Sequence, residues 1–418
     1  MTITRTAGEG RPGWSRNFGA PLTLTLVVLG LLDALGPLSI DLYLPAFPAL
    51  QQDLRLSDAE LQATLATMTI GMAIGQAFIG TWSDRVGRRR PLLLSAALHA
   101  AATTACAAAP SFALLTAFRL LQGIGAAGCA VVVLAMVRDL TSGREFVSMI
   151  SRVVLITTTA PLIAPVVGAA LLPAVGWRGI FAVLAAASAL LLIALIVVVP
   201  DRPGPPPTAP PRGRLGLVLS NPSFLRYALI GAMTYGGVYA YVAASPLLLQ
   251  RILGLPPSIY ALAVLVNSLG LVAGVQVAGR LSKTGSAAAV LAGFATLTLL
   301  GAVGLLSLHP LGLPAVLPCL WLFVVGCGGC FPGAVAGALR DQGARAGTAA
   351  SAYGFVTFAS ASLVAPLPGL FGVTDATSTA LVLTATASVS LLTVAADRAR
   401  TRRTRREVEA TEDRASKV

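Results

Sequence analysis

The sequence predicts an all-α membrane protein of twelve transmembrane helices, arranged as two pseudo-symmetric six-helix halves. Hydrophobic residues make up 56% of the 418 residues and charged residues only 11%, whereas soluble proteins carry roughly 25% charged residues. Apolar runs long enough to cross a bilayer recur along the whole chain, and basic residues gather in every second connection between them. A surface so poor in charge has to be covered largely by lipid.

Twelve apolar stretches have the length of a membrane span. A span needs about 20 residues, because each residue rises about 1.5 Å across a hydrocarbon core of roughly 30 Å. Pro110 and Pro310 mark short turns after the third and the ninth stretch. The predicted spans cover residues 22–44, 60–82, 91–110, 112–137, 147–172, 178–199, 225–249, 258–280, 286–308, 312–337, 346–371 and 377–396.

The connections divide the chain into four segments. Residues 1–199 form an N-terminal six-helix half, 200–224 a linker, 225–396 a C-terminal six-helix half and 397–418 a charged tail that we expect to fray. Prolines crowd the linker between Pro200 and Pro211, so this segment should be extended and solvated. No signal peptide is expected, because the first apolar run has full span length and lacks a cleavage site of small residues.

The basic residues predict the orientation in the membrane. If the N-terminus is inside, Arg55, Arg178 and Arg251 are the basic residues on the outer side, and Arg119 lies within a span. The rest of the 30 Lys and Arg residues are then cytoplasmic. Because basic residues near span ends are retained in the cytoplasm, we expect a bacterial cytoplasmic membrane protein with both termini inside.

Composition argues against several classes of function. The two histidines and five cysteines lie in apolar runs, and Cys327 and Cys330 lack the second pair that a metal site of this spacing needs. Neither Lys283 nor Lys417 follows a phosphate-binding loop. The net charge of +13 is spread over the connections and is not gathered on one nucleic-acid-binding face. We therefore expect no enzyme activity, metal, ATP or nucleic-acid partner.

Several segments carry recognisable motifs. Residues 80–90 read GTWSDRVGRRR after the second span, and a reduced copy without the acid, residues 278–285, follows the eighth. The others are SIDLYLPAFP at 39–48, RLLQGIGAA at 119–127 with VRD at 137–139, APLIAPVVGA at 160–169 and GWRGIF at 176–181. In this order and spacing they resemble the major facilitator superfamily and, within it, the Bcr/CflA drug-resistance exporters, relatives of the bicyclomycin and chloramphenicol efflux proteins. The resemblance implies the major facilitator fold and drug:proton antiport.

Two acids lie within the first predicted span, although a carboxylate at the bilayer centre costs at least ~2.5–3.5 kcal/mol. Asp41 precedes Pro45 and Pro48, which interrupt the helix. It is a candidate proton or substrate site, or alternatively a carboxylate at the membrane interface that faces water. Asp33 lies eight residues earlier, about 12 Å deeper along a regular helix. It is either a second functional acid or a carboxylate held by hydrogen bonds between helices.

Arg119 is the basic residue inside a span. In the family, the matching arginine is implicated in proton transfer, and a fixed positive charge near a buried acid favours the ionised form of that acid. Alternatively, the Arg119 side chain snorkels to the headgroups. One sequence leaves open whether Arg119 approaches Asp33 or Asp41.

The resemblance assigns gating roles to Asp84, Arg85, Gly87, Arg88, Pro161, Pro165 and Gly168. Asp84 would pair with basic residues and with the positive end of a neighbouring helix, holding the inner gate shut. Alternatively, the arginines only anchor the topology. The two prolines of the fifth span remove backbone donors, and Gly168 lets a partner helix approach closely. This fifth-span pattern is associated with antiporters more than with symporters.

These features together predict a proton-coupled antiporter that exports small drug-like compounds by alternating access. Asp41 and Asp33 would bind the proton, and the compound would compete for the same cavity. The alternatives are an exporter of a metabolite such as an amino acid, an uptake symporter, and a receptor or scaffold without transport. Protons are the expected coupling ion, no cofactor is expected, and the chain should be a monomer. Candidate substrate-binding residues are Tyr43, Gln122, Tyr239 and Asn267.

Overall fold

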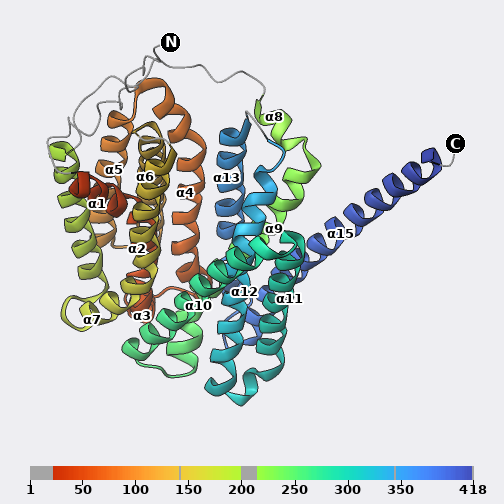
Figure 1. Ribbon diagram of the computed structural model, residues 1–418. Helices are drawn as coiled ribbons and strands as arrows, with labels where there is room; N and C mark the ends of the chain where they lie inside the picture. The colour runs from red at the N-terminus through yellow and green to blue at the C-terminus, as the bar shows by residue number, and fades with distance from the viewer. Residues whose placement is uncertain (1–21, 141–142, 199–213, 343–344, 417–418) are drawn as a thin grey trace, which may run out of the picture.

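The computed structural model describes residues 22–140, 143–198, 214–342 and 345–416, and every regular element in these ranges is a helix (Figure 1). The first half contains α1 (Leu22–Asp33), α2 (Leu35–Asp41), the 3-10 helix η1 (Leu44–Ala46), α3 (Phe47–Leu54), α4 (Asp58–Val86), α5 (Arg89–Ala107), α6 (Phe112–Leu140) and α7 (Gly143–Val198).

The second half begins with α8 (Arg214–Leu219) and α9 (Pro222–Pro246), and it continues with the π-helical segment η2 (Leu247–Ile252), α10 (Pro257–Thr284), α11 (Ala287–Leu308), η3 (His309–Leu311), α12 (Leu313–Leu339), α13 (Ala346–Val364), α14 (Leu367–Leu370) and α15 (Thr377–Ser416). Part of the predicted linker, residues 199–213, lies outside the described residues.

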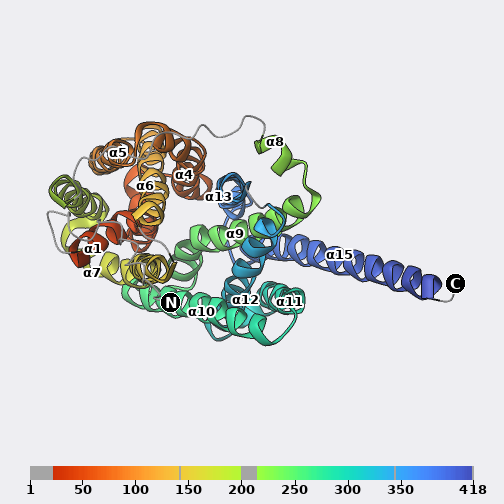
Figure 2. The ribbon, with the colours of Figure 1, turned by 45° about the horizontal axis from the view of Figure 1, so that its top comes forward.

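Two helical bundles lie beside each other (Figure 2). In the first, α4 and α5 pack on α6, and α1, α2 and α5 pack on α7. In the second, α12 packs on α9, α10 and α11, while α9 also contacts α13 and α15. The bundles meet where α4 contacts α13 and α7 contacts α10. We call the end of the molecule that carries α8 the linker end and the end that carries α3 the far end (Figure 1).

The helices have the length and composition of membrane spans. In the described part of the chain, eight helices are long and apolar enough to cross a membrane, and a ninth is counted if α1 and the α2–α3 segment form one span bent by 45°. The remaining predicted spans are also helical: α5 has 19 residues and α9 has 25. Large apolar side chains such as Phe78 (68% exposed) and Leu363 (73% exposed) lie on the outside, as lipid contact requires.

Helix α7 contains both the fifth and the sixth predicted span. Gly176 separates them, with φ 64° and ψ −176°, a conformation that glycine adopts without steric cost. The next two side chains fasten this corner to the end of α3: Trp177 Nε1 donates to Asp53 Oδ2 at 3.0 Å, and Arg178 forms an ion pair with Asp53. The Arg178 guanidinium also lies 4.2 Å from the Trp177 ring centroid.

Two boundaries differ from the prediction. The first span does not end near residue 44 but continues through η1 and α3 to Leu54. Pro45 and Pro48 stand in the first turns of η1 and α3, where proline is tolerated because the N–H that it lacks has no intrahelical partner. The tail was expected to fray, yet α15 is helical to Ser416. Asp397, where the predicted tail begins, joins α15 to α9 by accepting from Arg226 Nε at 2.7 Å and from Tyr227 Oη at 2.9 Å.

Candidate functional site

Arg119 of α6 lies at the centre of a buried polar cluster in the first half. Its side chain is 0% exposed. Its Nε donates to the Thr64 carbonyl oxygen at 3.2 Å, and its Nη1 donates to the Ser39 carbonyl oxygen at 2.9 Å. The guanidinium also lies 4.4 Å from the centroid of the Tyr43 ring. The snorkelling alternative is therefore wrong, because backbone carbonyls of α2 and α4 hold this cation inside the bundle.

Gln122 extends the cluster from one turn further along α6. Its Oε1 accepts from Arg119 Nη1 at 2.7 Å, and its Nε2 donates to Thr103 Oγ1 at 2.9 Å and to Ser39 Oγ at 3.4 Å. Gln122 is 0% exposed. The amide thus links α2, α5 and α6 and orients the guanidinium.

His99 of α5 bridges two serines within the same cluster. Its Nε2 lies 2.9 Å from Ser39 Oγ, and its Nδ1 lies 3.0 Å from Ser188 Oγ of α7. The apolar run of sequence that contains His99 therefore does not describe its surroundings in the folded protein. Its apolar neighbours in the sequence are not its neighbours in space, because the polar groups come from other helices.

The helices of the cluster approach each other closely because glycines line their contacts. A Cβ atom on Gly123 of α6 would collide with the carbonyl oxygen of Met68 on α4, and one on Gly71 of α4 would collide with that of Leu120. Small residues at helix contacts permit this backbone approach. The short separation brings the Thr64 carbonyl within reach of Arg119.

Asp33 is held within the first half, away from Arg119. Thr157 Oγ1 of α7 donates to Asp33 Oδ2 at 2.5 Å. Pro161 follows four residues after Thr157 on α7 and cannot donate the helical hydrogen bond to the Thr157 carbonyl. The hydrogen bond between helices fits one of the two alternatives for Asp33.

Asp41 lies at the end of α2 and faces the second half. Among the described residues, its carboxylate has neither a hydrogen bond nor an ion pair. It lies close enough to Tyr239, Tyr241 and Tyr260 to act on them electrostatically. The sequence left open whether Arg119 approaches Asp33 or Asp41. In the structure, Arg119 forms an ion pair with neither acid.

The second half presents a polar and an aromatic group of residues to Asp41. Asn267 Nδ2 of α10 donates to Tyr241 Oη of α9 at 2.7 Å, and Asn267 is 3% exposed. Tyr239 stacks on Tyr235 with ring centroids 6.3 Å apart, and it meets Phe358 of α13 edge-on at 6.4 Å. The predicted residue Tyr239 thus lies within electrostatic reach of Asp41, and the predicted residue Asn267 bonds to Tyr241, which also lies within that reach.

Asp84 and Arg88 of the predicted inner gate form an ion-pair network with Asp139 at the linker end, where Arg85 is exposed. Arg88 Nη1 donates to Asp84 Oδ1 at 2.5 Å and to Ser83 Oγ at 2.8 Å, and Arg88 Nε donates to Asp139 Oδ2 of α6 at 2.7 Å. Burial lowers the pKa of Arg88, but its hydrogen bonds to Asp139 and Asp84 outweigh this effect and raise the pKa above the ordinary value. Gly87 ends α4 with φ 87°, which lets the chain turn back so that Arg88 reaches Asp84.

Gly168 of α7 packs directly on α2. A Cβ atom there would collide with the carbonyl oxygen of Leu42, so the close approach expected of this glycine is present. Pro161 and Pro165 precede it in the same helix. This contact joins α7 to the residue that follows Asp41.

The structure brings together residues that the sequence could only place on separate spans. Arg119, Gln122 and Tyr43 share one buried cluster, whereas Asp41 belongs with Tyr239 and Asn267. Sequence reasoning missed Ser39, Thr64, Thr103, His99 and Ser188. Small hydroxyl residues within apolar runs are common in helices, where they bond to their own backbone, so no sequence signal distinguishes these positions.

Comparison with known proteins places the chain among transporters. Residues 29–366 match the family model of the Major Facilitator Superfamily. An uncharacterized MFS-type transporter, YdgK of Bacillus subtilis (strain 168), is 31% identical over 358 residues, which are 82% of this chain and 88% of that protein.

Two similar proteins have names that refer to drug resistance. The bicyclomycin resistance protein homolog of Haemophilus influenzae is 29% identical over 238 residues, or 55% of this chain and 59% of that protein. The multidrug resistance protein MdtL of Escherichia coli O45:K1 is 32% identical over 228 residues, or 54% of this chain and 58% of that protein. Each match thus spans little more than half of either protein.

Solved structures with the same fold have low sequence identity. A bacterial homolog to the human lysosomal transporter Spinster, in an inward-facing and occupied conformation, superposes with a TM-score of 0.69 at 17% identity, covering 92% of this chain and 96% of that chain. A D-xylose-proton symporter superposes with a TM-score of 0.70 at 15% identity, covering 89% and 97%. These likenesses show the fold alone.

Proposed function

The chain belongs to the major facilitator superfamily and is a membrane transporter, not an enzyme, and we propose that it exports small drug-like compounds in exchange for protons. Its similarity to a bicyclomycin resistance protein homolog and to MdtL supports a drug as the cargo. The motifs that resemble those of bicyclomycin and chloramphenicol efflux proteins suggest these two compound types. The transport would follow alternating access, in which a site between the halves opens to one side of the membrane at a time.

The position of Asp41 carries this proposal. It is an acid within the helical bundle that has no hydrogen-bond partner among the described residues, and it faces tyrosines of the other half. Ionisable residues inside membrane helices usually serve a transport pathway or a proton relay. A carboxylate without a fixed partner can exchange its proton for a bound compound, whereas one locked in an ion pair cannot do so as readily.

The other charged groups would support this exchange. Asp33 would act as a counter-charge for cationic compounds, while Thr157 holds its carboxylate in place. Arg119 would supply a fixed positive charge that is held by the Ser39 carbonyl of α2, the helix that carries Asp41, and by the Thr64 carbonyl of α4. Tyr239 and Asn267 would line the cargo site from the second half.

The membrane orientation is part of the same proposal. We place the protein in a bacterial cytoplasmic membrane with both termini and the linker end facing the cytoplasm. This orientation is supported by the arginines within residues 85–90 and by Arg226 and Arg340, because basic residues near span ends are retained in the cytoplasm. The far end, with Arg251, then faces outward.

Proton release tests the proposal directly. Adding chloramphenicol or bicyclomycin to detergent-solubilised protein should release protons, and a pH gradient should drive efflux of the same compound from proteoliposomes. Asp41→Asn mimics the protonated acid permanently, so we expect binding of the neutral compound to persist while proton release and gradient-driven efflux are lost. Asp33→Asn should weaken mainly the transport of cationic compounds.

Asp375→Asn is a matched control, because Asp375 is an exposed acid in the turn before α15 and its pKa is lowered by its hydrogen bond from the Thr377 backbone. This variant should behave as wild type. Normal proton release and efflux by Asp41→Asn would remove Asp41 from the mechanism. Gradient-driven transport of an amino acid but of neither drug would support the metabolite exporter instead.

A further inference from the structure

In the described part of the chain, the cluster of buried apolar residues that both halves share lies towards the far end. This cluster includes Leu44, Phe47, Leu50, Leu247, Leu248 and Tyr260. The other two clusters, which lie nearer the linker end, each contain residues of a single half. The far end is therefore the closed end of this conformation.

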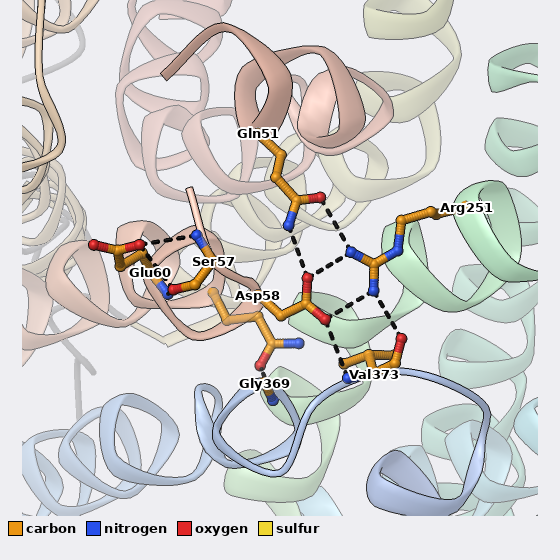
Figure 3. A network of polar contacts seen from close by, with 8 residues as sticks. Gln51, Ser57, Asp58, Glu60, Arg251, Gly369 and Val373 are labelled. Carbon is orange, nitrogen blue, oxygen red and sulfur yellow. Dashed lines mark hydrogen bonds and ion pairs between the residues drawn. The ribbon is translucent and has the colours of Figure 1, made fainter. Parts of the chain in front are cut away.

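Arg251 of η2 crosses between the halves at this closed end (Figure 3). Its Nη1 donates to Asp58 Oδ1 at 2.5 Å, and its Nη2 donates to Asp58 Oδ2 at 2.7 Å. A bidentate pair of this kind combines charge with a fixed geometry. The hydrogen bonds to Asp58 raise the pKa of the Arg251 guanidinium, which therefore keeps its charge.

Further hydrogen bonds surround this ion pair (Figure 3). Arg251 Nη2 also donates to the Val373 carbonyl oxygen at 2.7 Å, and the Val373 N–H donates to Asp58 Oδ2 at 3.1 Å. Gln51 Nε2 donates to Asp58 Oδ1 at 2.7 Å. One acid of the first half is thus bound by both a side chain and a backbone N–H of the second.

The chain positions Asp58 for this role. Ser57 caps α4 with a capping box, in which Ser57 Oγ accepts from the Glu60 N–H at 3.3 Å and the Glu60 carboxylate accepts from the Ser57 N–H at 2.8 Å. Asp58 is the first residue of the helix, where the helix dipole favours a negative charge. Gln62, one turn later, accepts from the Gly369 N–H at 2.7 Å.

The linker end has a different arrangement. The Asp84–Arg88–Asp139 network there lies entirely within the first half. In the described part of the chain, the network around Asp58 and Gln62 supplies hydrogen bonds that join the two halves. Separation of the halves at the far end must therefore break this network.

We propose that Asp58, Arg251, Gln51, Gln62 and the backbone of Val373 and Gly369 form an outer latch, which holds the far end closed and must open to release cargo. Its role in release rests on the proposed export function, whereas its closure of the far end does not. Helix α4 connects the latch to the charged cluster, because Thr64, whose carbonyl binds Arg119, lies six residues after Asp58 on the same helix. Movement of α4 when the latch opens therefore also moves the Thr64 carbonyl that binds Arg119.

A distance measurement across the far end tests the latch without cargo or a pH gradient. Spin labels on cysteines replacing Gln52 and Thr374, both exposed, report separation of the halves on a background without the five native cysteines. We expect one short distance in the parent protein. Asp58→Asn and Arg251→Gln should add a longer distance and lower the closed-to-open ratio about tenfold, because each removes charged hydrogen bonds. Arg251→Lys, which keeps the charge but not the fork, should fall between.

Glu60→Gln is the matched control, since Glu60 is a carboxylate on the same helical turn that bonds only to Ser57. It should retain the short distance. Distances as short in Asp58→Asn and Arg251→Gln as in Glu60→Gln would overturn the latch. Because the readout involves neither drug nor proton, a failure of the proposed export function leaves this result unaffected, and a failure of the latch leaves proton release by Asp41 unaffected.

Discussion

The buried charge of Arg119 is stabilised by polar groups that lie close to it in space. Its charge has no carboxylate partner, and two backbone carbonyls on other helices and the Gln122 amide take that place. One nitrogen, Nη2, has no hydrogen-bond partner. A guanidinium can hold several acceptors at once because its donors form a rigid fork, so this position requires arginine for its shape as well as its charge.

Replacing Arg119 by lysine tests that requirement. A lysine keeps the charge but cannot reach the Ser39 and Thr64 carbonyls together, so we expect Arg119→Lys to lose about 1.5–3 kcal/mol of stability. Gradient-driven efflux should fall with it. Unfolding titrations in SDS and efflux from proteoliposomes measure the two effects. Arg138→Lys serves as the control, because the side chain of Arg138 is 63% exposed. Equal stability and efflux of the two variants would contradict the requirement for a guanidinium at position 119.

The sequence identified the charged residues of the site but not their partners. Asp33, Asp41 and Arg119 were visible because a charge inside an apolar run is costly and rare. Arg119 bonds to backbone carbonyls of two other helices, and Asp33 accepts from a hydroxyl group of α7. These contacts depend on helix packing. For the same reason the sequence did not reveal the latch, in which Asp58 and Arg251 stand at ordinary positions near span ends.

At the scale of helices, the contact between α2 and α7 determines how closely Asp41 is held. The lengths of the apolar stretches predicted both helices, but not the bend between α1 and α2 or the continuation of the first span to Leu54. The prolines do interrupt the helix, since α2 ends at Asp41, and their positions in the first turns of η1 and α3 let a helix restart so that the span continues. Only the three-dimensional path of the chain distinguishes these outcomes.

Gly168→Ala tests the contact between α2 and α7. The added methyl group meets the Leu42 carbonyl oxygen, so α7 must move away from α2, and overpacking of this kind costs about 1–3 kcal/mol. Efflux should slow as well. Gly279→Ala on α10 is the control, because a Cβ atom there meets no atom within 4 Å and alanine favours a helix over glycine by about 1 kcal/mol. Thermal stability in detergent that falls equally in both would exclude a specific role for Gly168.

The linker-end network gives a second prediction at the scale of helices. Asp84 is 48% exposed, and surface pairs contribute only about 0–1 kcal/mol, so Asp84→Asn should leave expression near normal. It should nevertheless favour inward-facing states and slow efflux, because in the gating role that the family resemblance implies Asp84 holds the linker end shut. Asp139→Asn should act similarly through Arg88, which pairs with both acids. Efflux rates equal to those of Arg90→Gln, an exposed control, would show that the loop only anchors the topology.

At the scale of the whole molecule, the described structure has different interactions at its two ends. Ion pairs within the first half occupy the linker end, and the latch between the halves occupies the far end. Composition, charge and the lengths of the apolar stretches were sufficient to predict the membrane class and the number of spans, since these are properties of the whole sequence, and the resemblance of the motifs implied the major facilitator fold. The conformation is not such a property, because both ends are built from the same chain and only their contacts reveal which end is closed.

The role of the latch at the far end depends on which end of the molecule faces the cytoplasm. Cysteine labelling determines this orientation. Ser220 and Ser258 are exposed and flank α9, whose 25 residues span about 37 Å at 1.5 Å per residue. Ser258 is preferable to Gly254, whose φ of 70° strains any cysteine. On a background without native cysteines, an impermeant maleimide on intact cells should label Ser258→Cys, whereas Ser220→Cys should react only after permeabilisation. The reverse pattern would show that the far end faces the cytoplasm. The Asp58–Arg251 latch would then close the cytoplasmic end and control the entry of cargo instead of its release.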